Sequence, residues 1–163
     1  MKVIYFFIIS LFLLTSCGSF KKTTSHKAHN TSVSSSNKTN NIVSNAKSYI
    51  GTRYRYGGTT KKGMDCSGLI YTAFNNNGIS LQRTSFEMSK QGKPIKRANT
   101  KKGDLLFFKT SKTGRSINHV GLVTKVIGNN IYFVHSTSSK GVIESKLSTN
   151  YWNKAFKFTK RVL

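Results

Sequence analysis

The sequence predicts an α+β fold, with helices in the first half of the folded region and an antiparallel sheet in the second. Two observations predict it. Apolar residues recur at helical spacing within residues 42–50 and 66–76. From residue 105 onward, apolar residues instead form short runs rich in β-branched and aromatic side chains, separated by turn-forming residues. Because the two kinds of segment do not alternate, a βαβ arrangement is not expected.

Three helices are expected before the sheet. The first, 42–50, has its apolar positions at Ile42, Val43, Ala46 and Ile50 and is closed by Gly51. The second, 66–76, has its apolar side at Leu69, Ile70, Ala73 and Phe74 and stops at Gly78. A third is predicted over 85–91. The spacing in the first two helices predicts that each buries one face.

Five strands are expected after the helices. They are predicted at 105–108, 120–127, 131–135, 142–143 and 156–163. Gly128, Asn129 and Asn130 separate the second strand from the third, and these residue types are typical of a tight hairpin turn. The second and third strands are therefore expected to lie side by side.

The first residues have the pattern of an export signal. Lys2 is followed by an almost unbroken apolar run from Val3 to Leu14, which is shorter than the ~20 residues that span a bilayer. The run ends in Leu14-Thr15-Ser16-Cys17 and resembles the bacterial lipobox. This resemblance implies a lipoprotein signal peptide at 1–16 and a lipid on Cys17 that holds the protein on a membrane. The alternative is a plain secretory signal with an incidental cysteine.

A polar segment separates Cys17 from the predicted domain. Residues 17–41 are mostly Ser, Thr, Asn and Lys, a composition that cannot bury enough apolar surface to order itself. We therefore expect a flexible linker over 17–41 and one domain over 42–163. His26 and His29 lie in the linker, where solvated side chains are expected more than a metal site.

The charge balance points to an anionic partner or surface. The 163 residues include 27 Lys and Arg against 4 Asp and Glu, for a net charge of +23. Nucleic acid, acidic lipid and cell-wall polymer all fit this balance. The export signal argues against nucleic acid.

Cys66 is the candidate nucleophile. A cysteine that opens a helix lies beside unpaired backbone amides and the positive end of the helix dipole, which favour a thiolate. Position alone leaves open that Cys66 is only a small buried residue.

The only histidines after residue 41 are His119 and His135, in two strands expected to be neighbours. They could supply a general base and an orienting group. Spacing typical of zinc ligands is absent, and no metal is expected.

Four blocks of sequence resemble the NlpC-type cell-wall cysteine peptidases, in that family's order. They are YRYGGTTKKGMDCSGLI, GDLLFF, NHVGLV and FVHSTSSKGVIES. The resemblance runs from about residue 42 to the C-terminus. It implies a papain-like fold in which a helix presents the cysteine against a small antiparallel sheet that carries the histidines.

The resemblance also implies roles for individual residues. Cys66 corresponds to the nucleophile, His119 to the general base and His135 to the third polar member. Tyr54 corresponds to a tyrosine beside the nucleophile that donates to the developing oxyanion. The substrate-binding positions correspond to Asp65, Ser67, Arg83 and Thr84. Asp65 could equally be a simple cap of the helix that begins at Cys66.

These features predict a lipid-anchored cysteine peptidase that cuts peptides of bacterial peptidoglycan without a cofactor. We expect a monomer in the cell envelope, on the outer membrane if the cell has one. The peptides concerned are the stem or cross-link peptides. The alternatives are a wall-binding module without turnover and an acyltransferase, although acyltransferases of this superfamily place the histidine before the cysteine.

Overall fold

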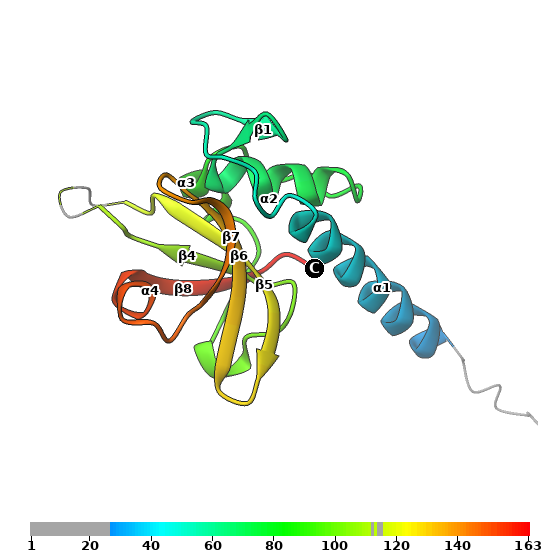
Figure 1. Cartoon of the computed structure of the whole chain (residues 1–163). Coiled ribbons are helices and arrows are strands. Elements are labelled where there is room, and N and C mark those ends of the chain that lie inside the picture. Colours follow the sequence, from blue (N-terminus) through cyan, green and yellow to red (C-terminus); the bar gives the residue numbers. More distant parts are fainter. Residues whose placement is uncertain (1–26, 112, 114–115) are drawn as a thin grey trace, which may run out of the picture.

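The computed structural model describes residues 27–111, 113 and 116–163, with side chains described from Ser35 onward. Its helices are α1 (Lys27–Lys47), α2 (Cys66–Asn75), α3 (Ser85–Met88) and α4 (Asn150–Ala155), with a 3-10 turn at Arg97–Asn99. Its strands are β1 (Thr59–Thr60), β2 (Gly63–Met64), β3 (Lys93–Ile95), β4 (Leu105–Phe108), β5 (His119–Ile127), β6 (Asn130–Thr137), β7 (Gly141–Lys146) and β8 (Phe156–Arg161). The predicted α+β class is confirmed (Figure 1).

The main sheet has six strands in the order β3-β8-β4-β5-β6-β7, and every neighbouring pair is antiparallel. The last strand, β8, is inserted between β3 and β4, so the end of the chain lies inside the sheet. β5, β6 and β7 follow one another as hairpins. The first of these hairpins turns through Gly128 and Asn129, because Ile127 pairs with Asn130.

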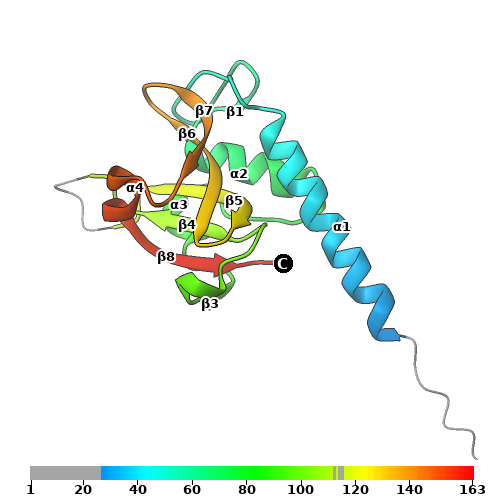
Figure 2. The ribbon, with the colours of Figure 1, turned by 60° about the horizontal axis from the view of Figure 1, so that its bottom comes forward.

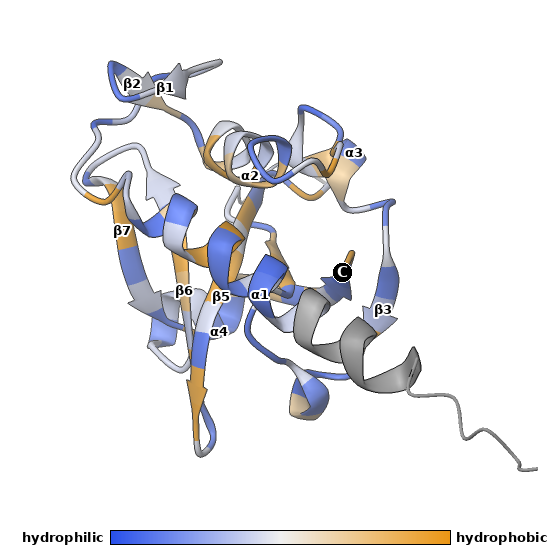
Figure 3. Cartoon of the chain, turned by 90° about the vertical axis from the view of Figure 1, so that its right-hand side faces the viewer, coloured by the Kyte–Doolittle hydropathy of each residue, from blue (hydrophilic) through white to orange (hydrophobic). Residues whose placement is uncertain are grey.

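Two hydrophobic clusters cover the two faces of the sheet. On one face, α1 and α2 pack on side chains such as Phe107, Val120 and Leu122. On the other face, Trp152 and Ala155 of α4 pack on Phe108 and Phe133, among others. Figure 2 shows α1 and α2 close together and α4 on the opposite side of the sheet. Figure 3 shows hydrophobic residues concentrated in α2 and the strands, whereas the loop between β1 and β2 is hydrophilic.

Most predicted elements occur within a residue or two of their predicted bounds. β4 matches at both ends, and α2 ends one residue early, with Gly78 in the left-handed region at φ 70° just beyond it. The third predicted helix is shorter, a single turn at α3. Four features were missed: β3, the 3-10 turn at Arg97–Asn99, α4 and the small β1–β2 hairpin. They are too short for a periodic pattern of apolar residues to develop.

The first helix differs most from its prediction. It begins at Lys27, well inside the predicted linker, and ends at Lys47 before Ile50. Ile42, Val43 and Ala46 are buried as expected, but Ile50 lies in a turn and is 46% exposed. Residues 35–38 are exposed. The segment from Lys27 contains no glycine or proline, so once the buried end of α1 is formed, polar turns can extend it into solvent.

The predicted signal peptide at 1–16, Cys17 and the predicted linker up to residue 26 lie outside the described residues. The domain boundary at residue 42 therefore stays a prediction. Within the part of the chain that is described, no helix is both long enough and apolar enough to cross a bilayer.

Candidate active site

Cys66 is the first residue of α2, as predicted, and Asp65 is the residue that caps this helix. Asp65 has extended backbone angles, φ −88° and ψ 176°, and its Oδ1 accepts a hydrogen bond from the Gly68 N–H at 2.6 Å. Such a cap satisfies one of the amides that a helix start leaves unpaired. The Asp65 cap, which directly follows strand β2, therefore places the thiol at the N-terminal end of α2.

Asp65 also joins α2 to the segment before α3. Its Oδ1 and Oδ2 accept from the two terminal nitrogens of Arg83 at 3.0 and 2.8 Å, a two-point ion pair. Arg83 donates further to Ser67 Oγ at 2.9 Å, and the Gly57 N–H donates to Asp65 Oδ2 at 2.7 Å. Thr84 caps α3 by accepting from the Glu87 N–H. Asp65 is thus the cap of α2 and also lines a pocket, and its role in binding substrate stays a prediction.

The two histidines lie on the same face of the sheet. The Nε2 atom of His119 on β5 is 2.9 Å from the Nδ1 atom of His135 on β6, and the rings are nearly perpendicular. The Nε2 atom of His135 is in turn 2.9 Å from Ser145 Oγ on β7. Three adjacent strands therefore supply one chain of hydrogen bonds, from His119 through His135 to Ser145.

This row of hydrogen bonds allows only one arrangement of protons if His119 acts as a base through Nδ1. A neutral ring with Nδ1 free carries its proton on Nε2, which then donates to His135 Nδ1. His135 must carry its own proton on Nε2 and donate it to the hydroxyl of Ser145. In this arrangement the Ser145 hydroxyl, which can accept or donate, accepts from His135, and His135 accepts from His119.

Trp152 of α4 encloses the histidine pair. Its ring stacks on His119 with 5.1 Å between centroids and 22° between planes, and meets His135 edge-on at 4.5 Å. The sequence analysis missed both Trp152 and Ser145. A short helix without periodicity and a serine in an edge strand carry no signal of a site until the sheet brings them to the histidines.

Burial keeps the Cys66 thiol and the His119 imidazole uncharged. It lowers the pKa of His119 to about 4, and burial together with the charge of His119 lowers the pKa of His135. Burial also raises the pKa of the Cys66 thiol, although backbone N–H groups, that of Val120 first, act in the opposite direction. The thiolate expected from the helix start is therefore not the resting form. The effect of desolvation on the pKa of the thiol is larger than that of the backbone N–H groups. Cys66 therefore rests as a thiol beside a neutral His119 imidazole.

Tyr54 lies beside Cys66, as predicted. Burial raises the pKa of its phenol, and the negative charges of Cys66, once its thiol has ionised at high pH, and of Asp65 raise it further. The phenol therefore keeps its proton and remains a hydrogen-bond donor. Met64, which precedes the capping Asp65, forms an isolated bridge with Tyr54, so the backbone fixes the spacing between phenol and thiol.

Two pockets open on either side of the thiol. One, of about 530 Å³, is lined by His119, Trp152 and the loop between β6 and β7. The other, of about 370 Å³, is lined by Asp65, Ser67, Arg83 and Thr84. Tyr54, Cys66 and Asn118 line both. All the predicted site residues of the domain thus border one or both pockets, except His135, which lies behind His119.

Comparison with known proteins gives the family. The NlpC/P60 family profile matches residues 51–161, more than half of the chain and all of the site. The chain belongs to the NlpC/P60 family. The structure is similar to the crystal structure of an NlpC/P60 family protein from Bacillus cereus, with a TM-score of 0.68 and 28% identity over 77% of this chain and 40% of that one.

Two curated relatives carry names that describe activities. A "Murein DD-endopeptidase MepS/Murein LD-carboxypeptidase" of Escherichia coli is 42% identical over 75% of this chain and 62% of its own length. A "Gamma-DL-glutamyl hydrolase" of Bacillus subtilis is 41% identical over 74% of this chain and 29% of its own length. The chain therefore spans about three fifths or less of these relatives, and the two names specify different bonds.

The described residues around Cys66 do not form a metal site. Among the described residues, no three histidine, cysteine or acidic side chains lie close enough together to hold a metal ion. Cys66 is unpaired within the described part of the chain. The groups available for chemistry are therefore a thiol, an imidazole and hydrogen-bond donors.

Replacing Ser145 with alanine is expected to lower kcat by about tenfold with little change in KM. The substitution leaves the His135 N–H without its partner, which costs about 1–3 kcal/mol and weakens the hold on the orientation of the two rings. Ser145→Thr keeps the hydroxyl and should restore most of kcat. Steady-state kinetics on a soluble wall peptide checks both. Equal kcat values for wild type and Ser145→Ala would contradict this role.

The stability of the protein is expected to fall as the pH is lowered from about 7 to about 4.5. The folded pKa values of both histidines lie below the ordinary value of about 6.5, so the unfolded chain binds more protons in this interval. Each histidine adds a slope of up to about 1.4 kcal/mol per pH unit. Urea unfolding at half-unit steps measures it. His119→Gln and His135→Gln should each flatten the slope, and a flat wild-type profile would contradict the assignment.

Proposed function

We propose that this chain is a peptidoglycan hydrolase, a cysteine endopeptidase that cleaves stem or cross-link peptides of the bacterial cell wall. The observation that carries the proposal is that the Cys66 thiol and the His119 imidazole line one pocket, with His135 hydrogen-bonded to His119 behind it. Both relatives named above are hydrolases, and the E. coli relative is named for murein. Membership of the NlpC/P60 family supports the same reaction class.

The proposed reaction begins with proton transfer. As the Cys66 sulfur attacks the carbonyl carbon of the scissile peptide, the thiol proton passes to Nδ1 of His119. The imidazolium formed in this step faces the ring of Trp152, which stabilises a cation in a site that otherwise disfavours one. His135 holds the ring of His119 in place through the hydrogen bond at Nε2.

The tetrahedral intermediate then collapses. Its oxyanion is held by the Tyr54 phenol and the backbone N–H of Cys66. The C–N bond breaks, His119 gives its proton to the leaving amine, and a thioester to Cys66 remains. His119 next removes a proton from water, which attacks the thioester. The carboxylic acid leaves and the thiol is restored, so no oxidant, reductant or cofactor is consumed.

A digest of purified peptidoglycan tests the proposal. The chain from Gly18 onward and its Cys66→Ala variant are incubated with the same wall preparation, and soluble products are identified by mass spectrometry. New fragments are expected from the native chain alone. Their masses distinguish cleavage of a D-alanyl cross-link from cleavage of a γ-D-glutamyl bond within one stem. A folded native chain that releases no fragments would favour the alternative, a wall-binding module without turnover.

We also propose that the mature protein is a lipoprotein that begins at Cys17 and is held on a membrane of the cell envelope, the outer membrane if the cell has one. The lipobox-like sequence supports this. Metabolic labelling with palmitate is expected to label the native protein and not a Cys17→Ser variant.

The domain from residue 42 onward is proposed to act as a monomer, which light scattering of the chain from Gly18 would check.

A further inference from the structure

The two sides of the thiol differ in charge. In the pocket beside Arg83, the guanidinium is neutralised by Asp65 at 2.8 Å. The pocket beside His119 is lined by no acidic residue, and Lys140 is the one cation among the described residues that line it. The pocket beside His119 therefore carries a positive charge that no described acidic residue neutralises.

The four acids of the chain are all engaged elsewhere. They pair as Asp65 with Arg83, Glu87 with Lys90, Asp104 with Arg161 and Glu144 with Lys125. None of these pairs includes Lys140. An acidic partner for the Lys140 ammonium must therefore come from outside the described chain.

The backbone holds Lys140 at the rim of this pocket. Gly141, with φ 65°, packs so closely on the backbone of Thr52 and Arg53 that a Cβ atom would lie 2.2 Å from the Thr52 carbonyl oxygen. Two hydrogen bonds join Val142 to Gly51 and Thr52. The Lys140 N–H is tied back to Thr137 Oγ1 at 3.1 Å. The turn before β7 is thus clamped against the loop that carries Arg53.

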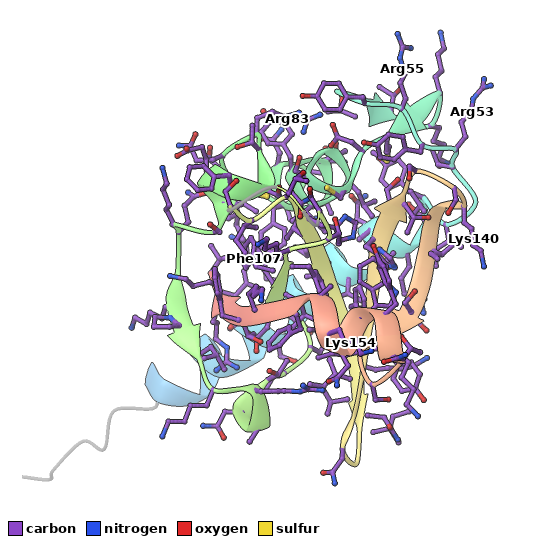
Figure 4. All side chains as sticks on the ribbon, turned by 90° about the vertical axis from the view of Figure 1, so that its left-hand side faces the viewer. Arg53, Arg55, Arg83, Phe107, Lys140 and Lys154 are labelled. Carbon is purple, nitrogen blue, oxygen red and sulfur yellow. The ribbon has the colours of Figure 1, made fainter. Side chains whose placement is uncertain are left out.

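Several hydroxyl groups line the same pocket as Lys140. Figure 4 shows Arg53, Arg55 and Lys140 along the same side of the molecule, away from Lys154. Ser138 and Ser139 line the pocket and are exposed, so their hydroxyls are available to a ligand. Ammonium and hydroxyl donors converging on one pocket match a carboxylate, which accepts several hydrogen bonds at once.

We infer that the pocket beside His119 is a subsite for a carboxylate on the substrate residue that supplies the leaving amine. The inference rests on the proposed function. His119 protonates that amine, so the leaving residue must lie on the side of the thiol that His119 lines. Lys140 supplies the charge, and Ser138 and Ser139 supply hydrogen bonds. The substrate class is a peptide whose released amino acid bears a free carboxylate, such as the diamino acid of a wall cross-link.

The test compares two soluble wall peptides that differ only at this carboxylate, free in one and amidated in the other. Lys140→Gln in the full mature chain is expected to raise KM for the free carboxylate by about threefold to tenfold, with kcat nearly unchanged. KM for the amidated peptide should change by less than about twofold. Lys93→Gln on β3, at the opposite edge of the sheet, makes the same charge change and should leave both KM values as in wild type.

Binding without turnover separates this inference from the proposed function. In a Cys66→Ala background, calorimetric titration should show tighter binding of the free carboxylate, and Lys140→Gln should remove the preference. That result would support the subsite even if the native chain cut neither peptide. Equal changes for both peptides, or the same loss in Lys93→Gln, would overturn it and indicate only a general attraction of anions to a basic surface.

Discussion

Replacing His119 with glutamine is expected to lower kcat/KM at pH 7 by about 10³–10⁴-fold. Burial raises the pKa of the Cys66 thiol, so hardly any thiolate is present before substrate binds. The base must therefore remove the proton during attack, and glutamine has no basic nitrogen to do so. Its amide N–H can still donate to His135, so the loss reports proton transfer more than collapse of the site.

Two further measurements distinguish this explanation from misfolding. The His119→Gln variant should unfold in one cooperative step, and its residual rate should rise with pH as the thiol ionises. Alkylation of wild-type Cys66 by iodoacetamide should be slower at pH 7 than alkylation of free cysteine, because the thiolate is the reactive form. A variant that keeps more than about a tenth of wild-type activity at pH 7 would show that another group removes the proton.

Replacing Asp65 with alanine is expected to lower the free energy of unfolding by about 2–4 kcal/mol and to abolish most activity. The change removes the helix cap, about 1 kcal/mol, and the charge-assisted hydrogen bonds to Arg83. Asp65 is 7% exposed, so water replaces little of what is lost. Urea unfolding in a Cys66→Ala background measures the stability effect apart from turnover.

Glu87 supplies a matched control for Asp65. It also pairs with a cation, Lys90 at 2.9 Å, but both side chains are largely exposed. Glu87→Ala should cost no more than about 0.5 kcal/mol, as is usual for surface pairs. If the two alanine variants lost equal stability, the buried network around Asp65 would have no special role.

The contribution of Asp65 to the stability of the folded protein depends on pH in a definite direction. Burial alone would raise the pKa of Asp65, but hydrogen bonds from Arg83 and from the Gly68 N–H outweigh it and hold the pKa below its usual value. A lowered pKa contributes stability that is present at neutral pH and is lost as the pH falls below about 4. Asp65→Asn should lack this acid-side loss, whereas the loss between pH 7 and 4.5 due to the histidines should persist.

Local sequence predicted the elements that have a strong pattern. Leu69, Ile70, Ala73 and Phe74 share one side of α2 because a helix repeats every 3.6 residues, and all four are buried. The turn at Gly128 and Asn129 predicted the hairpin that makes β5 and β6 neighbours, and with it the proximity of His119 and His135. Cys66 was placed at a helix start by the polar turn before it. These are short-range consequences of chain geometry.

The elements without such a pattern were not predictable. β3 is three residues long and owes its existence to pairing with β8, more than 60 residues later. α4 has a single turn and a half, and its one buried residue, Ala155, gives no periodicity. The polar half of α1 was expected to be a coil because composition favours one. Its helical form follows from the buried turn at Ile42 to Ala46, which composition does not reveal.

The order of the residues is enough to predict the α+β class, the cysteine at the helix start and the two histidines on neighbouring strands, and it carries the resemblance to the NlpC/P60 family. The proton state of the site, in contrast, depends on packing. Burial is a property of the packed chain, and it reverses the effect of the helix start on Cys66. The same packing brings Ser145, Trp152 and Lys140 to the site. The segments that carry them have no sequence pattern that indicates a site, because residues far apart in the sequence meet only in the folded sheet.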